Sequence, residues 1–285
     1  MSRIAYVNGA YVPLAGAAVG IEDRGFQFAD GVYEGIAVRK GRLIDLEPHL
    51  QRLWRSMGEL DMDAPMAVGP MRLVLSEVVR QNRIADGFLY VQVTRGEARR
   101  DHAFPAFSRP SLIVTCRRFD YDAVFTRAAT GVKAKSVPDI RWGRCDIKSI
   151  SLLPNVLAKQ AARSEGAFEA VLIDTDGNVT EGSSTNVWMV DGTNTLITRA
   201  TSDNILPGIT RAVLADLAAE HQVRVDTRPF SLEEAYQARE LFLTSTTSGV
   251  MPIVALDGRT IASGRPGPLA GRLLAAYKTH MDSCP

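Results

Sequence analysis

Lys148 lies in the stretch Arg144-Cys145-Asp146-Ile147-Lys148-Ser149-Ile150, beside an apolar residue and just before a segment of helical character at 152–165. Two interpretations are open. Lysine side chains are rarely buried, so Lys148 can be a solvated surface charge. An amine held in an enclosed site can instead lose its proton, attack a carbonyl and form a Schiff base. The stretch alone does not decide between them, so the rest of the chain must provide a site for this lysine.

Glu181 opens a second group, Glu181-Gly182-Ser183-Ser184-Thr185-Asn186, between two segments of strand character. A carboxylate followed by glycine and small polar residues can be a solvated turn. It can also be a carboxylate held against a heterocyclic nitrogen, with the small residues letting a ligand lie close to the backbone.

Two further segments carry groups that bind anions. Gly208-Ile209-Thr210 follows Pro207 and begins a helix, where free N–H groups and the helix dipole favour negative charge. Thr244-Ser245-Thr246-Thr247-Ser248 places five hydroxyl side chains in a row at a strand end. Each can be ordinary capping or turn chemistry, and together with an arginine they would form a phosphate site.

The charged loop 95–110 contains Arg100-Asp101-His102. Such a pair can be exposed charge, or it can hold a carboxylate, because arginine offers a bidentate fork. Tyr33, in Asp30-Gly31-Val32-Tyr33-Glu34, is interpreted as a half-buried strand aromatic whose hydroxyl could line a pocket.

Other classes of site have weaker support. Cys145 and the scattered serines suggest a nucleophilic hydrolase, but the chain has no G-x-S-x-G elbow, P-loop or G-x-G-x-x-G fingerprint. The four histidines are far apart and form no HExxH or CxxC pattern, so no metal site is expected.

The composition is that of a soluble globular protein, with 46% hydrophobic and 23% charged residues among 285. A net charge of +1 gives no indication of nucleic acid or an anionic membrane as partner, and no apolar run is long enough to span a bilayer. Three widely spaced cysteines argue against a disulfide framework and favour the cytoplasm.

The segments that must position these groups predict an α+β first half and a mixed second half, with a linker at 117–123. Hairpins are expected at 4–12 and 32–46, and helices from about Glu47 and from Pro70. Strands are expected at 88–94 and 111–117. The second half is expected to hold helices at 152–165, from Ile209 to about His221, and at 268–281, and strands at 131–137, 168–174, 179–180, 185–190, 196–199, 240–245 and 250–256. Two domains follow: a smaller one at 1–120, and a larger one at 121–285 with Lys148.

The chain resembles the fold-type IV pyridoxal-phosphate aminotransferases over nearly its whole length, and among them the D-amino-acid (D-alanine) aminotransferases. The resemblance is carried by Lys148 and Glu181, 33 residues apart, in their motifs. Further matching segments are Glu22-Asp23-Arg24-Gly25, Asp30-Gly31-Val32-Tyr33-Glu34, Val93-Thr94-Arg95-Gly96, Asp139-Ile140-Arg141-Trp142-Gly143, Gly208-Ile209-Thr210 and residues 244–248. It implies a small α/β N-terminal domain and a larger C-terminal pseudo-barrel domain.

The resemblance also implies roles for individual residues. Lys148 would hold pyridoxal phosphate as a Schiff base and then act as the base, and Glu181 would pair with the pyridine nitrogen. The implied cofactor contacts are Arg52, Lys148, Glu181, Leu206, Ile209, Thr210, Ser245 and Thr246. Tyr33, Arg100 and His102 would bind the substrate carboxylate, the last two reaching in from the neighbouring subunit of a homodimer.

The implied reaction is ping-pong transfer of an amino group from a D-amino acid such as D-alanine to a 2-oxo acid such as 2-oxoglutarate. One departure favours an L-branched-chain aminotransferase instead, because Leu206-Pro207-Gly208-Ile209-Thr210 looks more like the loop of that class. Two more readings of the same fold stay open: an aminodeoxychorismate lyase-like enzyme and a non-catalytic pyridoxal-phosphate binder.

Overall fold

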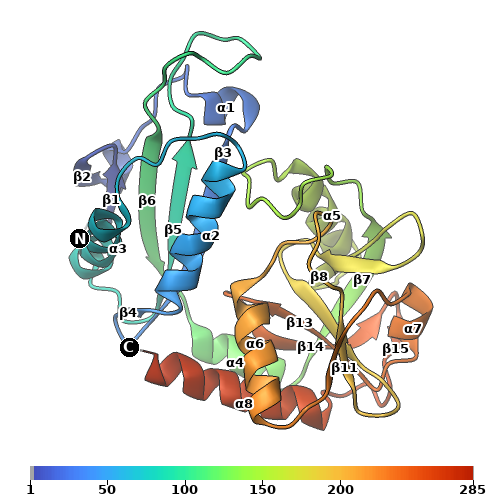
Figure 1. The fold of residues 1–285 in the computed structure, drawn as a ribbon. Coiled ribbons are helices and arrows are strands. Elements are labelled where there is room, and N and C mark those ends of the chain that lie inside the picture. The colour runs from blue at the N-terminus through green and yellow to red at the C-terminus, as the bar shows by residue number, and fades with distance from the viewer. Residues whose placement is uncertain (1–2, 285) are drawn as a thin grey trace. The chain divides into compact units, whose positions relative to one another are not determined.

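The computed structural model describes residues 3–284, which pack as two units (Figure 1). The first unit comprises residues up to Asp120 together with Ile147–Ser151 and the C-terminal end from Cys284. The second comprises Tyr121–Asp146 and Leu152–Ser283. The sequence places Lys148 in the larger, C-terminal domain, whereas its packing places it in the first unit. The division of the chain into domains near residue 120 stays a prediction.

The first unit is built on a six-stranded sheet in the order β2-β1-β6-β5-β3-β4, with every neighbouring pair antiparallel. The strands are β1 (Ile4–Val7), β2 (Ala10–Pro13), β3 (Gly31–Arg39), β4 (Arg42–Leu43), β5 (Gly87–Thr94) and β6 (Ser111–Arg118). Both expected hairpins are confirmed, with turns at Asn8-Gly9 and Lys40-Gly41. In both turns, each residue has a positive φ, the geometry that such sequences favour.

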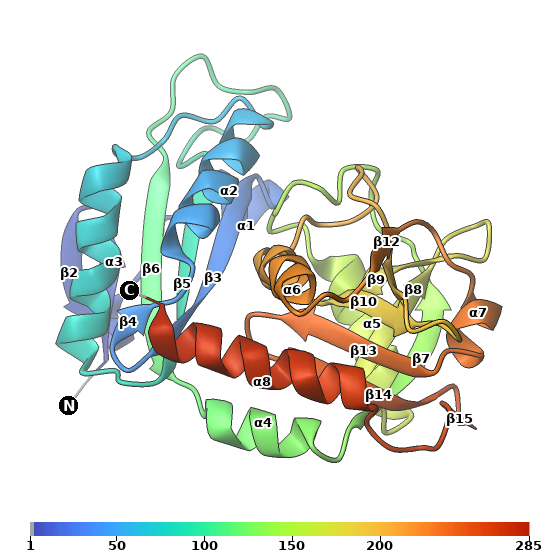
Figure 2. The ribbon, with the colours of Figure 1, turned by 60° about the horizontal axis from the view of Figure 1, so that its bottom comes forward.

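Helices α2 (Leu46–Gly58) and α3 (Val68–Asn82) cover one face of this sheet (Figure 2). Alternate residues of each strand point toward them, as the period of a strand requires. The apolar core contains Ile36, Leu89 and Val114 from the sheet and Leu53 and Leu75 from the helices. The expected helix starts, near Glu47 and Pro70, are correct to within two residues.

In the first unit, two short helices lie where the sequence predicts none: η1 (Leu14–Gly16) and α1 (Arg24–Phe28). The stretch around α1 is interpreted from the sequence as a polar loop. Asp23 caps α1, because its side chain accepts from Gly25 N–H at 2.8 Å. The helix ends at Ala29, whose φ is 56°.

The second unit contains a nine-stranded mixed sheet in the order β12-β11-β10-β13-β14-β7-β8-β9, with β15 beside β14. The strands are β7 (Val132–Pro138), β8 (Glu169–Ile173), β9 (Val179–Gly182), β10 (Asn186–Val190), β11 (Leu196–Thr198), β12 (Val225–Thr227), β13 (Glu240–Ser245), β14 (Gly249–Leu256) and β15 (Arg259–Thr260). Strand β7 runs parallel to both its neighbours, β14 and β8. The short strands β12 and β15 are not predicted from the sequence.

Five helices belong to the second unit: α4 (Tyr121–Ala128), α5 (Leu153–Ser164), α6 (Ile209–Glu220), α7 (Leu232–Tyr236) and α8 (Pro268–Ser283). The expectations for α5, α6 and α8 are confirmed. The expected linker at 117–123 is wrong, because it comprises the end of β6 and the start of α4. Helix α4 buries Tyr121, Val124, Phe125 and Ala128, which lie on one face at helical spacing.

Among the helices that the structure describes, each is too short or too polar to cross a lipid bilayer.

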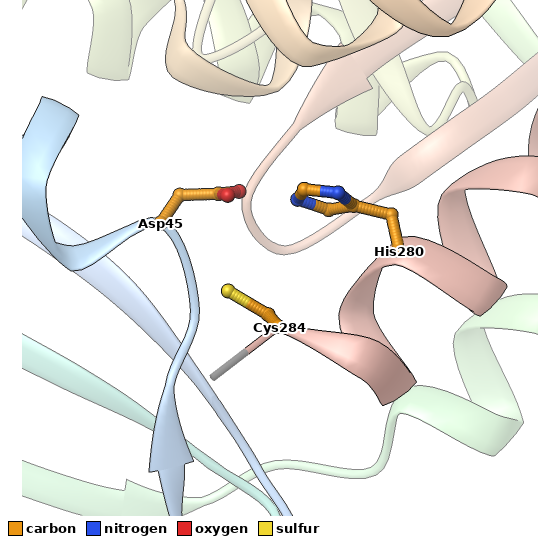
Figure 3. Close-up of side chains that lie close together, drawn as sticks. All are labelled: Asp45, His280 and Cys284. Carbon is orange, nitrogen blue, oxygen red and sulfur yellow. The ribbon is translucent and has the colours of Figure 1, made fainter.

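The sequence predicts no metal site. Figure 3 shows three side chains of types that can bind metals, Asp45, His280 and Cys284. Asp45 and Cys284 belong to the first unit and His280 to α8 of the second. The His280 ring stacks on Tyr277 of its own helix, with ring centroids 6.2 Å apart. We assign no metal site to these residues, since they belong to separate units.

Candidate active site

Lys148 is held by its backbone along the edge of β3. Tyr33 N–H donates to the Lys148 carbonyl at 3.0 Å, and Ile150 N–H donates to the Gly31 carbonyl at 3.0 Å. The neighbouring Ile147 is buried in the apolar core of the first unit. The Lys148 side chain is half-buried, and its Nζ lies 4.2 Å from the centroid of the Tyr33 ring. The structure thus brings two predicted site residues together, and it fixes the lysine backbone while leaving the amine on a flexible stem.

Gly31 is required for this arrangement. A Cβ atom at this position would lie 2.8 Å from the Val93 carbonyl oxygen and 2.9 Å from Ile150 Cδ1. Both distances are shorter than ordinary contacts, so a larger residue would displace the lysine segment from the strand.

Arg52, predicted to contact phosphate, is bound to a buried carboxylate that is not identified from the sequence. Its Nε and Nη2 donate to the two oxygens of Glu34 at 2.7 and 2.9 Å. His49 Nδ1 lies 2.7 Å from the same carboxylate. Burial alone would raise the Glu34 pKa. Arg52 and His49 lower the pKa by more than burial raises it, so it lies well below the ordinary range.

The sequence does contain a signal for this group. Glu34 lies two residues from both Val32 and Ile36, so on a strand it shares their face and is predicted to point toward the core. His49 and Arg52 are three residues apart and therefore share a face of their helix. A buried carboxylate needs a cationic partner, so these patterns together predict the contact.

Arg100 and His102 are exposed and share one aromatic partner in the first unit. The Phe28 ring centroid lies 4.7 Å from Arg100 Cζ and 5.5 Å from the His102 centroid. Arg24 holds their loop in position, because its Nη1 donates to the Asp101 carbonyl at 2.6 Å. The Arg24 guanidinium is itself fixed by Asp30, which accepts from Nε at 2.7 Å. Tyr33 lies against Tyr90 and Lys148 instead, with the tyrosine centroids 5.6 Å apart.

Glu181 lies in the second unit, near the end of β9, and is 5% exposed. The solvated-turn interpretation is therefore wrong. Arg141 Nη1 donates to one carboxylate oxygen, and Asn186 Nδ2 donates to the other at 2.9 Å. Leu206 N–H lies 3.2 Å from both oxygens. Burial raises the Glu181 pKa, and Arg141 only partly offsets this increase.

A second acid supports Arg141. Asp139 accepts from Arg141 Nε and Nη2 at 2.9 and 2.7 Å, and from the Thr180 hydroxyl at 2.7 Å. Burial raises the Asp139 pKa, but the hydrogen bonds from Arg141 and Thr180 lower it more. In the sequence, Asp139 and Arg141 appear only as part of a motif, and the contact between Arg141 and Glu181 is not predicted.

The predicted anion-binding helix start is present at α6. Gly208 is the N-cap of α6, and it has no side chain that could accept from the helix start. Ile209 and Thr210 occupy the first turn, whose N–H groups have no partner within the helix. Thr210 is 4% exposed. A Cβ atom on Gly208 would lie 2.0 Å from Asn186 Oδ1, so this position requires glycine.

The hydroxyl row at 244–248 is divided between structural and possible ligand roles. The Thr244 hydroxyl accepts from Trp188 Nε1 at 3.0 Å, and the Ser245 hydroxyl accepts from Ser248 N–H at 3.1 Å. Thr246 is half-buried in the turn that follows β13.

These residues fit pyridoxal phosphate. Glu181 is a buried carboxylate with a raised pKa, so a protonated ring nitrogen would stabilise its charged form. The start of α6 offers N–H groups of the kind that bind phosphate, and Lys148 offers an amine.

The rival nucleophile, Cys145, does not suit a hydrolase. Its thiol donates to the Trp142 carbonyl at 3.1 Å. Burial raises the pKa of the Cys145 thiol to about 11, so little thiolate is present near neutral pH.

Comparisons with known proteins agree with this geometry. Residues 31–256 match the family model described as amino-transferase class IV. The D-alanine aminotransferase of Bacillus licheniformis is 42% identical over 276 residues, which are 97% of this chain and 96% of that protein.

Two solved structures have a similar fold. The branched-chain amino acid aminotransferase of Escherichia coli has a TM-score of 0.92 at 23% identity, covering 98% of this chain and 94% of the other. The T.th. branched-chain amino acid aminotransferase, complexed with N-(5'-phosphopyridoxyl)-L-glutamate, has a TM-score of 0.90 at 26% identity and covers 100% and 96%. The predicted fold-type IV architecture is confirmed.

Proposed function

This chain belongs to the class IV aminotransferases and works with pyridoxal phosphate, and we propose that it transfers the amino group of a D-amino acid such as D-alanine to a 2-oxo acid such as 2-oxoglutarate. The observation that carries the proposal is the 42% identity to a D-alanine aminotransferase over nearly the full length of both chains. The Arg100-Asp101-His102 loop, held by Arg24 and Phe28, supports the same donor class.

Bound pyridoxal phosphate supplies an electron-accepting ring that stabilises the carbanion formed at the substrate α-carbon. We assign two roles to Lys148 Nζ: it would hold the cofactor covalently and, as a free amine, would remove the substrate α-proton. The hydrogen bonds to β3 fix the lysine backbone while the side chain moves. The Tyr33 ring face stabilises the amine when it carries a proton.

We assign to Glu181 the pairing with the ring nitrogen, which keeps that nitrogen protonated. The phosphate is assigned to Arg52, to the backbone and hydroxyl groups of Ile209 and Thr210, and to Thr246, with Leu206 and Ser245 beside them. The Arg52 guanidinium has five N–H donors, and the Glu34 carboxylate takes two of them, which orients the group.

The substrate carboxylate is assigned to Tyr33, Arg100 and His102. In one chain, Tyr33 lies with Lys148, whereas Arg100 and His102 are exposed around Phe28. We propose that the protein is a homodimer in which each chain supplies Arg100 and His102 to its partner. Three free cysteines support a cytoplasmic location.

Paired donors test the reaction. With 2-oxoglutarate as acceptor, D-alanine should yield pyruvate, and omitting the acceptor should abolish turnover. The Lys148→Ala variant should lose the visible absorbance band of bound cofactor together with this activity. Turnover of L-leucine but not D-alanine would contradict the proposal, and so would pyruvate release from aminodeoxychorismate without an acceptor.

The L-branched-chain alternative has one specific observation in its favour, the Leu206-Pro207-Gly208-Ile209-Thr210 segment at the start of α6. Three residues of this segment, Leu206, Ile209 and Thr210, are assigned to the cofactor, whereas Arg100 and His102 are assigned to the substrate. Donor stereochemistry should therefore follow the latter pair.

A further inference from the structure

A row of alternating charges extends from the buried Glu181 to two partly buried residues that the proposed reaction leaves without a role. It consists of Asp139, Arg141 and Glu181, all in the second unit, with exposed side-chain fractions of 11%, 7% and 6%. We propose that Arg141, itself held by Asp139, is a positioning residue that keeps Glu181 ionised and oriented as the partner of the cofactor ring nitrogen. This inference rests on the role proposed for Glu181.

The geometry between Arg141 and Asp139 is that of a fork. Two parallel N–H groups of Arg141 reach the two oxygens of Asp139, at 2.9 and 2.7 Å. Such bidentate pairs fix the plane of the guanidinium group. Nη2 also donates to the Asn204 carbonyl at 3.1 Å, which leaves Arg141 little freedom to rotate.

The fixed guanidinium in turn favours the ionised form of Glu181. A carboxylate buried without a cation would be driven toward its neutral form, because burial penalises charge. Arg141 Nη1 donates to Glu181 and supplies that cation before any ligand arrives. Asn186 and the Leu206 N–H add neutral donors, so the carboxylate is held from several sides.

Asp139 has a second effect, because its negative charge offsets the positive charge of Arg141. The row of three carries one net negative charge, which suits a cationic ring nitrogen. Arg211 is another cation near Glu181, and its Nη2 donates to the Arg199 carbonyl at 2.9 Å. Arg141 differs from Arg211 in binding the carboxylate directly.

The test compares how tightly the apoenzyme binds two probes: pyridoxal phosphate, and an analogue in which carbon replaces the ring nitrogen. Dissociation constants are measured by absorbance and by tryptophan fluorescence, so the readout does not depend on turnover. The wild-type protein should prefer pyridoxal phosphate by about tenfold or more, as expected for a charge-assisted hydrogen bond. Glu181→Gln should remove this preference.

Arg141→Gln should reduce the preference to within about twofold, and Arg141→Lys should retain most of it because lysine keeps the charge. Arg144→Gln is the matched control: Arg144 lies three residues away and pairs with Asp146 instead, at 2.9 Å. It should keep the full preference. Asp139→Asn provides an independent variant, which should lose part of the preference even if Arg141→Gln fails to fold.

The two proposals fail in different ways. Full preference in Arg141→Gln or in Asp139→Asn, together with its loss in Glu181→Gln, would overturn the positioning role and leave the Glu181 assignment intact. Absence of any preference in the wild-type protein would overturn the Glu181 assignment and, with it, this inference.

Discussion

Glu34 is a buried carboxylate of the first unit on which two side chains of α2 converge. It is 1% exposed and binds both Arg52 and His49 from α2. Because Arg52 is assigned to the cofactor phosphate, the buried carboxylate connects the stability of the first unit to the cofactor site.

We expect Glu34→Gln to lower the free energy of unfolding of the apoenzyme by about 3–5 kcal/mol, because it leaves the buried guanidinium without its counter-charge. Urea denaturation measures the change. Glu47→Gln is the control, since Glu47 lies on α2, the helix of Arg52 and His49, in an exposed pair with Arg72, and its substitution should cost less than about 1 kcal/mol. Equal effects of the two substitutions would contradict the importance of the buried pair.

The same carboxylate predicts a pH dependence. Its pKa in the folded protein lies well below the ordinary value of 4.5, because Arg52 and His49 outweigh burial. Glu34 therefore stabilises the folded protein when the pH is above that ordinary pKa, and this stabilisation is lost as the pH falls toward the lower pKa of the folded state. Between about pH 5 and pH 3, the wild-type free energy of unfolding should fall more steeply than that of Glu34→Gln. Parallel curves would contradict this explanation.

At the residue scale, the sequence identifies chemical types better than partners. Lys148 and Glu181 stand out because their flanking residues are unusual, and both occupy defined positions. The contact between Arg141 and Glu181 joins residues 40 positions apart through the pairing of β7, β8 and β9. No local pattern contains that information.

At the scale of elements, the start of α6 and the strand β10 are closely fitted. Gly208 has no Cβ, and Asn186 at the start of β10 occupies the space beside it. Asn186 also donates to Glu181 and to the Leu206 carbonyl, at 2.9 and 3.0 Å. One amide therefore connects the Glu181 carboxylate to the helix start that is assigned to the phosphate.

We expect Gly208→Ala to displace Asn186 and to lower the free energy of unfolding by about 1–3 kcal/mol, the usual cost of overpacking. The affinity for pyridoxal phosphate should fall as well, measured by equilibrium titration of the apoenzyme. Gly271→Ala is the control, because open space surrounds that position within α8. It should stabilise the helix by up to about 1 kcal/mol and leave cofactor affinity unchanged.

Helices whose apolar residues recur over several turns are predicted correctly. Helices whose apolar pattern is short or divided, such as α4, are missed. The expected linker ends at residue 123, so it covers only the first turn of α4 and divides the apolar pattern of that helix. Helix α7 is absent from the expected elements, although the capping box between Ser231 and Glu234 is a sequence signal for a helix start. The order of strands in each sheet depends on contacts between distant segments, as in the pairing of β1 with β6.

At the scale of the whole molecule, the proposed homodimer predicts complementation between inactive variants. With the proposed roles, Lys148→Ala would lack the base and Arg100→Ala would bind substrate weakly. If Arg100 serves the partner, refolding an equal mixture should give heterodimers with one complete site each. About a quarter of the wild-type activity at low D-alanine concentration should then return, for random pairing in a twofold dimer.

If Arg100 served its own chain, every site in such a mixture would be defective and no activity would return. Each variant refolded alone is the control. Light scattering of the wild-type protein gives the mass of the assembly independently, and a monomer would contradict the proposal.

The lysine segment also has a consequence for synthesis on the ribosome. Residues 147–151 pack with the first unit, although the chain enters the second unit at Tyr121. The edge of β3 beside Gly31 therefore has no hydrogen-bonding partner until residue 151 has emerged from the ribosome. This happens well after the synthesis of β6, the last strand of the same sheet. During synthesis, the lysine segment can therefore join the first unit only after part of the second unit has been made, and Lys148 takes its position only from that moment.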